Sequence, residues 1–213
     1  MQALEKIAYS NNWVTVILLL LFLSVFLLKL LDAKRLKENF FGFFKVNFIK
    51  DEDLNSNKFL DAFQLVLFLF FVTVFSLLTH NFMGYLLPNF SNSLATFFNV
   101  FVVLLIYFLT KRILEFVLTF LFMIKETIQV FSFYKTRSLY SLSFFVYIAV
   151  ILCEYTLINQ LYSFYFAGFL FAARFVLYSV RNKNLIFNKL FYFILYICAF
   201  EIAPLFVLFK LMF

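Results

Sequence analysis

The sequence predicts an all-α fold: a polytopic helical membrane protein with six transmembrane helices plus one or two cytoplasmic interfacial amphipathic helices. Hydrophobic residues make up 65% of the chain and charged residues 14%, with a mean hydropathy of +0.99. Soluble domains are about half apolar and about a quarter charged. Long apolar runs recur along the chain, and the loops between them alternate in charge. We therefore expect one membrane domain over residues 1–213.

The expected spans are the apolar runs that match a bilayer in length. About 20 residues at about 1.5 Å each cover a hydrocarbon core of about 30 Å. The first run is longer than a signal-peptide core and no small-residue cleavage site follows it, so we expect it to be retained. The six runs cover residues 13–31, 60–79, 94–112, 139–158, 161–180 and 190–213.

The basic residues predict the orientation of these spans. Lys and Arg cluster in segments 32–59, 111–138 and 181–189, whereas loops 80–93 and 159–160 contain neither. The positive-inside rule then places the basic segments in the cytoplasm and both termini on the opposite side. The net charge of +7 is thus a topology signal, and we expect no nucleic-acid partner.

Two shorter segments have the character of helices that lie along a membrane surface. Over 113–134 the polar residues fall on less than half of a helical wheel, which predicts an interfacial helix on the cytoplasmic side, with a re-entrant segment as the alternative. Residues 36–49 contain five Phe between flanking Lys and Arg, which predicts a second interfacial segment.

Of the charged residues inside the expected spans, Glu154, Arg174 and Glu201 lie farthest from the span ends. Counted from the cytoplasmic end at about 1.5 Å per residue, Arg174 lies roughly 9 Å deep, Glu201 roughly 16 Å and Glu154 roughly 22 Å. A buried carboxylate costs several kcal/mol unless it is neutral, paired or facing water. Pairing between Arg174 and Glu201 would remove two lone charges, either as a structural lock between the last two spans or as part of a proton or solute site. Pro204 is expected to kink the helix beside Glu201.

Motifs for catalysis or metal binding are absent from the sequence. It contains no P-loop, HExxH, GxSxG, DFG or dinucleotide-binding pattern. Asp61 is the only Asp inside an expected span, so an intramembrane protease with two aspartates is not expected. Cys153 and Cys198 lie in apolar runs without CxxC spacing, so neither a disulfide nor a zinc site is expected. The single histidine, His80, ends an apolar run and is expected to be a solvated helix end. We expect no enzyme activity, no cofactor and no metal.

The two ends of the chain carry a family resemblance. Asn11-Asn12-Trp13 leads into the first span, and the tail has the order Tyr-x-Cys-x-x-Glu-x-x-Pro from Tyr196 to Pro204. In these features the chain resembles an uncharacterised family of integral membrane proteins of Bacteroidota-type bacteria, domain of unknown function 4271. The resemblance implies a bacterial inner-membrane location, so that both termini would be periplasmic. It implies no activity, but it favours Tyr196, Glu201 and Pro204 as a shared feature.

The function expected from the sequence is a non-catalytic subunit or assembly factor of a membrane complex. Its partners would be the lipid bilayer and other membrane proteins or further copies of the chain. The alternative is a small solute or proton-coupled carrier that uses Glu201 and Arg174. The candidate intramembrane polar site therefore consists of Glu154, Arg174, Tyr196, Glu201 and Pro204.

Overall fold

The computed structural model describes residues 12–41, 61–86, 92–121, 125–156 and 161–181. Five α-helices form this described part, so the prediction of an all-α fold is confirmed. The helices are α1 (Asn12–Phe40), α3 (Ala62–Leu86), α4 (Leu94–Leu121), α5 (Lys125–Tyr155) and α6 (Leu161–Arg181).

Four of the described helices are long and apolar enough to cross a membrane. They are Asn12–Phe40, Ala62–Leu86 and the portions Leu94–Leu114 of α4 and Thr136–Tyr155 of α5. Each corresponds to one of the first four expected spans. The fifth expected span, 161–180, coincides with α6, and the sixth, 190–213, lies outside the described residues.

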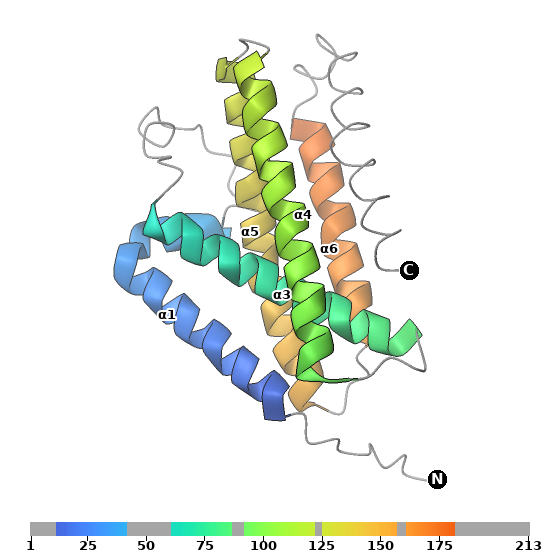
Figure 1. The fold of residues 1–213 in the computed structure, drawn as a ribbon. Coiled ribbons are helices and arrows are strands. Elements are labelled where there is room, and N and C mark those ends of the chain that lie inside the picture. Colours follow the sequence, from blue (N-terminus) through green and yellow to red (C-terminus); the bar gives the residue numbers. More distant parts are fainter. Residues whose placement is uncertain (1–11, 42–60, 87–91, 122–124, 157–160, 182–213) are drawn as a thin grey trace.

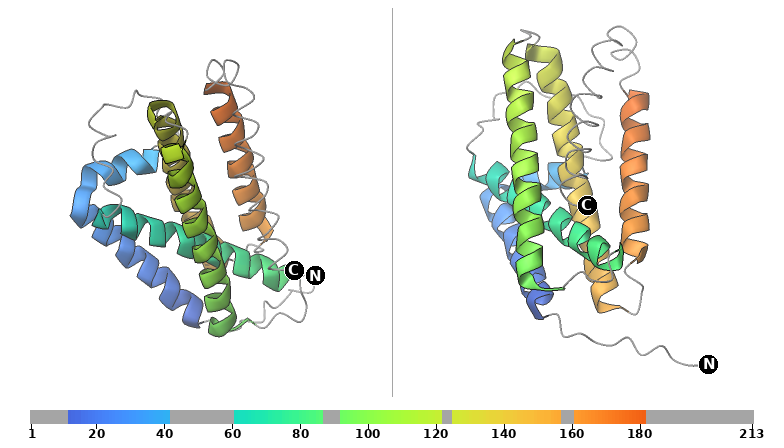
Figure 2. Two further views of the ribbon diagram at one scale, coloured as in Figure 1. Left: turned by 45° about the horizontal axis from the view of Figure 1, so that its top comes forward. Right: turned by 45° about the vertical axis from the view of Figure 1, so that its right-hand side comes forward.

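The helices form a bundle around α3 and α5, each of which contacts all four other described helices. Helices α4 and α5 run antiparallel as a long hairpin, α6 runs beside α5, and α1 and α3 cross the hairpin at a slant (Figures 1 and 2). Helix α5 contacts each of the other four helices, and the run Tyr140–Phe144 is buried on every side. This central position explains why α5 buries serine and tyrosine as well as apolar side chains.

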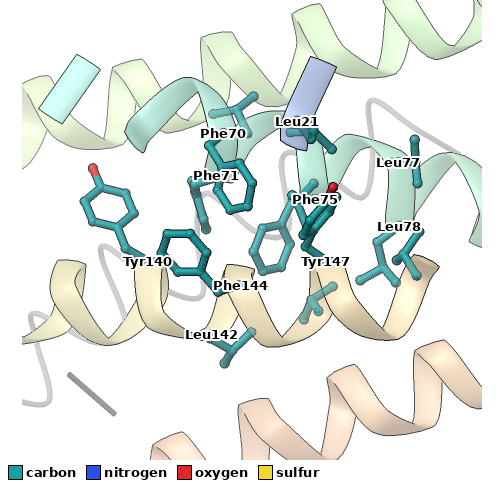
Figure 3. Packing of buried hydrophobic residues seen from close by; sticks show 14 of the residues in the cluster. Leu21, Phe70, Phe71, Phe75, Leu77, Leu78, Tyr140, Leu142, Phe144 and Tyr147 are labelled. Carbon is teal, nitrogen blue, oxygen red and sulfur yellow. The ribbon is translucent and has the colours of Figure 1, made fainter. Parts of the chain in front are cut away.

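The core lies between α3 and α5 and combines aromatic rings with aliphatic side chains (Figure 3). Phe70 stacks on Phe144 with ring centroids 4.8 Å apart, and Phe71 meets the edge of Phe108 of α4 at 4.7 Å. Lipid tails are as apolar as side chains, so membrane helices associate through packing and hydrogen bonds rather than through exclusion of water. Paired rings suit this task, since each pair contributes about 0.5–1.5 kcal/mol beyond its buried area.

Helix α1 packs on the bundle by a narrow stripe. Val14, Leu18, Leu21 and Leu28 are buried at helical spacing, and the Tyr147 hydroxyl of α5 donates a 3.0 Å hydrogen bond to the Leu18 carbonyl oxygen. The opposite face of α1 is exposed and apolar, as in a helix bordered by lipid or by a partner. Its exposed residues are Val16, Leu19, Leu20, Phe22, Leu23, Phe26, Leu27, Leu30 and Leu31.

The expectation of one interfacial helix over 113–134 is wrong. Helix α4 continues without a break to Leu121, and α5 begins at Lys125, so the segment divides between two antiparallel helices. The polar face expected over 113–134 requires that these residues belong to a single helix, separate from the span before it. No Gly or Pro occurs from 94 to 121, and Lys and Arg are good helix formers. Helix α4 therefore does not end at Lys111 and Arg112.

Candidate functional site

A bend in α1 organises the polar end of the bundle. The backbone of Asp32 is non-helical, and its Oδ1 accepts hydrogen bonds of 3.0 Å from the backbone N–H groups of Lys34 and Arg35. Asp32 therefore caps a second short helix, residues 33–40, which we call the second limb. A carboxylate cap of this kind stabilises a helix by about 0.5–2 kcal/mol.

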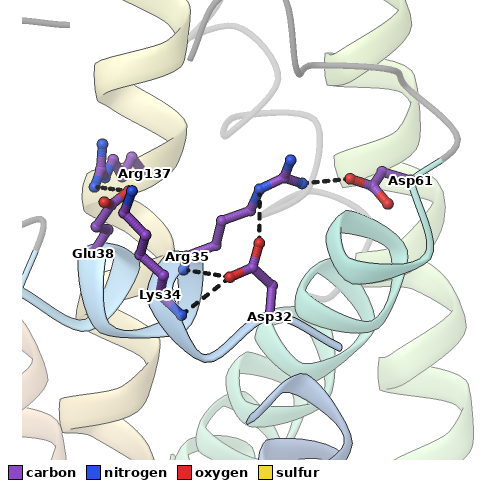
Figure 4. Close-up of polar contacts among 6 residues, drawn as sticks. All are labelled: Asp32, Lys34, Arg35, Glu38, Asp61 and Arg137. Atoms are coloured by element: carbon purple, nitrogen blue, oxygen red, sulfur yellow. Dashed lines mark hydrogen bonds and ion pairs between the residues drawn. The ribbon is translucent and has the colours of Figure 1, made fainter. Parts of the chain in front are cut away.

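Arg35 ties this bend to α3 (Figure 4). Its Nε lies 3.1 Å from Asp32 Oδ2, and its Nη1 donates a 2.6 Å hydrogen bond to Asp61 Oδ2. Asp61 precedes α3, and its carbonyl oxygen accepts the first hydrogen bond of that helix from the Leu65 N–H. One guanidinium thus connects the end of one long helix to the start of the next. The three side chains are 33–40% exposed, so water screens the pairs in part.

The second limb is also tied to α5. Glu38 Oε2 lies 3.6 Å from an Arg137 guanidinium nitrogen, and the Ser141 hydroxyl donates a 2.7 Å hydrogen bond to the Phe40 carbonyl oxygen. The Phe40 ring packs against Phe144 and Phe145, with centroids 5.7 and 5.3 Å apart. We call Asp32, Arg35, Glu38, Asp61 and Arg137 the charged cluster.

The charged cluster has the chemistry of a structural contact between helices. Each of its three carboxylates is ion-paired with an arginine, and these contacts join α1 to α3 and to α5. Within the described part of the chain, no three His, Cys, Asp or Glu side chains are grouped so that they could hold a metal ion. The hairpin is joined at the same end, where Arg112 donates a 3.1 Å hydrogen bond to the Thr136 hydroxyl.

His80 lies near the opposite end of α3 and is only 2% exposed, so the interpretation as a solvated helix end is wrong. Helix α3 continues six residues beyond it to Leu86, and the Trp13 ring of α1 covers it edge-on at 5.2 Å. His80 Nε2 lies 3.2 Å from the Thr96 hydroxyl, which itself donates to the Ser93 carbonyl at 2.7 Å. We infer that Nε2–H is the donor, and that His80 joins α1, α3 and α4.

The residues predicted as an intramembrane polar site are only partly described. Tyr196, Glu201 and Pro204 lie outside the described residues, so the Arg174–Glu201 pair stays a prediction. Arg174 is half-buried on α6, on the same side of the helix as the buried Ser163 and Ala167.

Glu154 is half-buried in the last turn of α5. Because α5 and α6 are antiparallel neighbours, residue 174 lies level with about residue 142. That level is roughly 18 Å along the axis from Glu154.

The charged cluster escaped sequence reasoning because its members were counted as separate signals. In the sequence, Arg35 and Arg137 indicate only topology and a membrane surface, and Asp61 counts only against an intramembrane protease with two aspartates. A usable signal was present, since Asp32 and Asp61 stand at the two ends of one basic segment, beside consecutive apolar runs. Their pairing through Arg35 spans 26 residues, which a local pattern does not show.

Comparison with known proteins identifies a family but no characterised relative. No curated protein and no solved structure matches the chain. The model of the family described as "Domain of unknown function (DUF4271)" matches residues 14–212, nearly the whole sequence. The chain therefore belongs to the DUF4271 family.

Proposed function

We propose that the protein is a multi-pass integral protein of the inner membrane of a Bacteroidota-type bacterium, and that it acts as a non-catalytic subunit or assembly factor of a membrane complex. The observation that carries the proposal is the use of polar side chains as ties between helices. Five side chains each join two different helices, namely those of Arg35, Arg137, Ser141, Tyr147 and His80.

These ties, in the part of the chain that the structure describes, favour a scaffold over a catalyst or a carrier. A catalytic or transport site needs polar groups that converge on a place where a substrate can bind. Here the hydroxyls of Ser141 and Tyr147 donate to main-chain carbonyls, and the carboxylates pair with arginines. A bundle braced in this way is suited to presenting a fixed surface to partners.

The proposed topology has six spans, with both termini in the periplasm. It is supported by the position of Arg35, Arg112 and Arg137, which the fold brings to one end of the bundle through their contacts with Asp61, Thr136 and Glu38. An end rich in arginine is expected on the cytoplasmic side of a bacterial inner membrane. His80 and Trp13 then lie toward the periplasm.

The exposed apolar face of α1 is consistent with a role in a complex. This helix is bordered by the bundle along one stripe, so its remaining sides are available to lipid and to the spans of another protein. Association of membrane helices through such faces depends on close packing.

The test is purification of the full chain in a mild detergent, followed by mass spectrometry of the proteins that accompany it. We expect one or more membrane proteins to be recovered reproducibly and in near-stoichiometric amounts. A tagged inner-membrane protein of similar size and expression level serves as the control for non-specific recovery. Repeated recovery of this chain alone, as a monomer or as a homo-oligomer, in several mild detergents would contradict the proposal.

A further inference from the structure

The second limb of α1, together with Phe41 which follows it, has one side against the core and one exposed side. Leu36 and Phe40 pack against the core, whereas Lys34, Lys37 and Phe41 are exposed. Residues spaced three and seven apart lie on the same side of a helix, so these three form one outward stripe. We call it the basic stripe.

Charge is sorted in the same way. Arg35 and Glu38 are held in ion pairs with Asp32, Asp61 and Arg137. Among the described residues, neither Lys34 nor Lys37 makes an ion pair. Asp32, Glu38 and Asp61, the carboxylates of the charged cluster, are thus already paired with arginines. The basic stripe presents two positive charges beside an aromatic ring that is 41% exposed.

The position of the basic stripe relative to the membrane follows from the length of α1. Residues 12–31 rise about 30 Å as a helix, which equals the thickness of the hydrocarbon core. A span of this length that begins at one boundary of the hydrocarbon core would bring the bend at Asp32 close to the phosphate groups at the other boundary. An exposed helix with lysines and an aromatic ring on one side is the pattern of segments that lie on anionic membranes.

We propose that Lys34 and Lys37 bind the phosphate groups of anionic phospholipids in the cytoplasmic leaflet, with Phe41 inserted among the upper acyl chains. The site rests on the proposed membrane location but not on any partner protein. The proposed site differs from the interfacial segment expected over 36–49. Arg35 is held in ion pairs with Asp32 and Asp61, so only the two lysines contact the lipid. Each lysine near an anionic surface changes affinity about fivefold, so loss of both predicts roughly 30-fold weaker binding.

The experiment compares the purified full chain with the variant Lys34→Gln/Lys37→Gln in detergent. Phosphatidylglycerol or phosphatidylcholine is titrated, and bound lipid is counted by native mass spectrometry, with the unfolding temperature as a second readout. We expect the wild type to retain phosphatidylglycerol in preference to phosphatidylcholine, and the double variant to lose this preference. Lys34→Arg/Lys37→Arg keeps the charge and is the matched control, which should bind as the wild type does.

Three outcomes would overturn the lipid site. They are equal retention of phosphatidylglycerol by the double glutamine variant, equal binding of the two lipids by the wild type, and equal stabilisation by inorganic phosphate. Should the double variant fail to fold, the single variants Lys34→Gln and Lys37→Gln are each expected to weaken binding about fivefold. Recovery of the wild type in the soluble fraction of cells would instead refute the membrane location itself.

Discussion

Replacing Phe70 by alanine is expected to lower the free energy of unfolding by about 3–5 kcal/mol. The Phe70 side chain is 1% exposed and stands between the two central helices, stacked on Phe144 at 4.8 Å and edge-on to Tyr147 at 5.6 Å. Its removal leaves a cavity in a close-packed region and ends both ring contacts. Unfolding by sodium dodecyl sulfate in mixed micelles, followed by circular dichroism, measures the loss.

The matched control for this change is Phe22→Ala on the outward face of α1. Phe22 is 69% exposed, so its truncation should change the stability in micelles by less than about 0.5 kcal/mol. Equal effects of the two substitutions would show that α3 and α5 do not form the core described here.

Replacing Arg35 by alanine is expected to lower the free energy of unfolding by about 2–3 kcal/mol. The change leaves Asp32 and Asp61 without their cation, and loss of one partner of a charged hydrogen bond costs more than the bond itself contributes. The expected loss of unfolding free energy is smaller than for a fully buried pair, because the three side chains are 33–40% exposed. Arg35→Lys should recover only part of the loss, since an ammonium cannot reproduce the two-sided contact of the guanidinium.

A double-mutant cycle with Asp61→Ala isolates the tie between α1 and α3. We expect a coupling free energy of about 1–2 kcal/mol between the two positions, because the 2.6 Å contact is charge-assisted. The pair Arg112 and Asp61 lies at the same end of the bundle, where Arg112 contacts Thr136 and Asp61 contacts Arg35. It provides the comparison, and its two substitutions should be additive. Additive effects of the Arg35 and Asp61 substitutions on the free energy of unfolding would contradict a stabilising contact between α1 and α3.

The all-α class and the approximate positions of the long apolar helices could be predicted from the sequence because their cause is local. Runs such as 13–31 and 94–112 are apolar over the length of a bilayer, and composition alone is enough to identify them. Helix ends were predicted less well. Helix α4 passes Lys111 and Arg112 without interruption, since charge marks where a membrane ends but does not break a helix.

The polar contacts could not be predicted, because each one depends on how separate helices are placed. Tyr147 and Leu18 are 129 residues apart, and Ser141 and Phe40 are 101 apart. His80 was misjudged for the same reason. Its position in the sequence suggested a helix end, and its burial comes from Trp13 and Thr96 on two other helices.

The orientation of the bundle in the membrane is tested most directly by labelling single cysteines in spheroplasts with a membrane-impermeant maleimide. On a background with Cys153 and Cys198 replaced by serine, one cysteine is placed at Lys37 and another at Asn92, both exposed and at opposite ends of the bundle. The proposed topology predicts labelling at position 92 in intact spheroplasts, and at position 37 only after the membrane is permeabilised. Labelling of position 37 in intact spheroplasts, with position 92 protected, would contradict it.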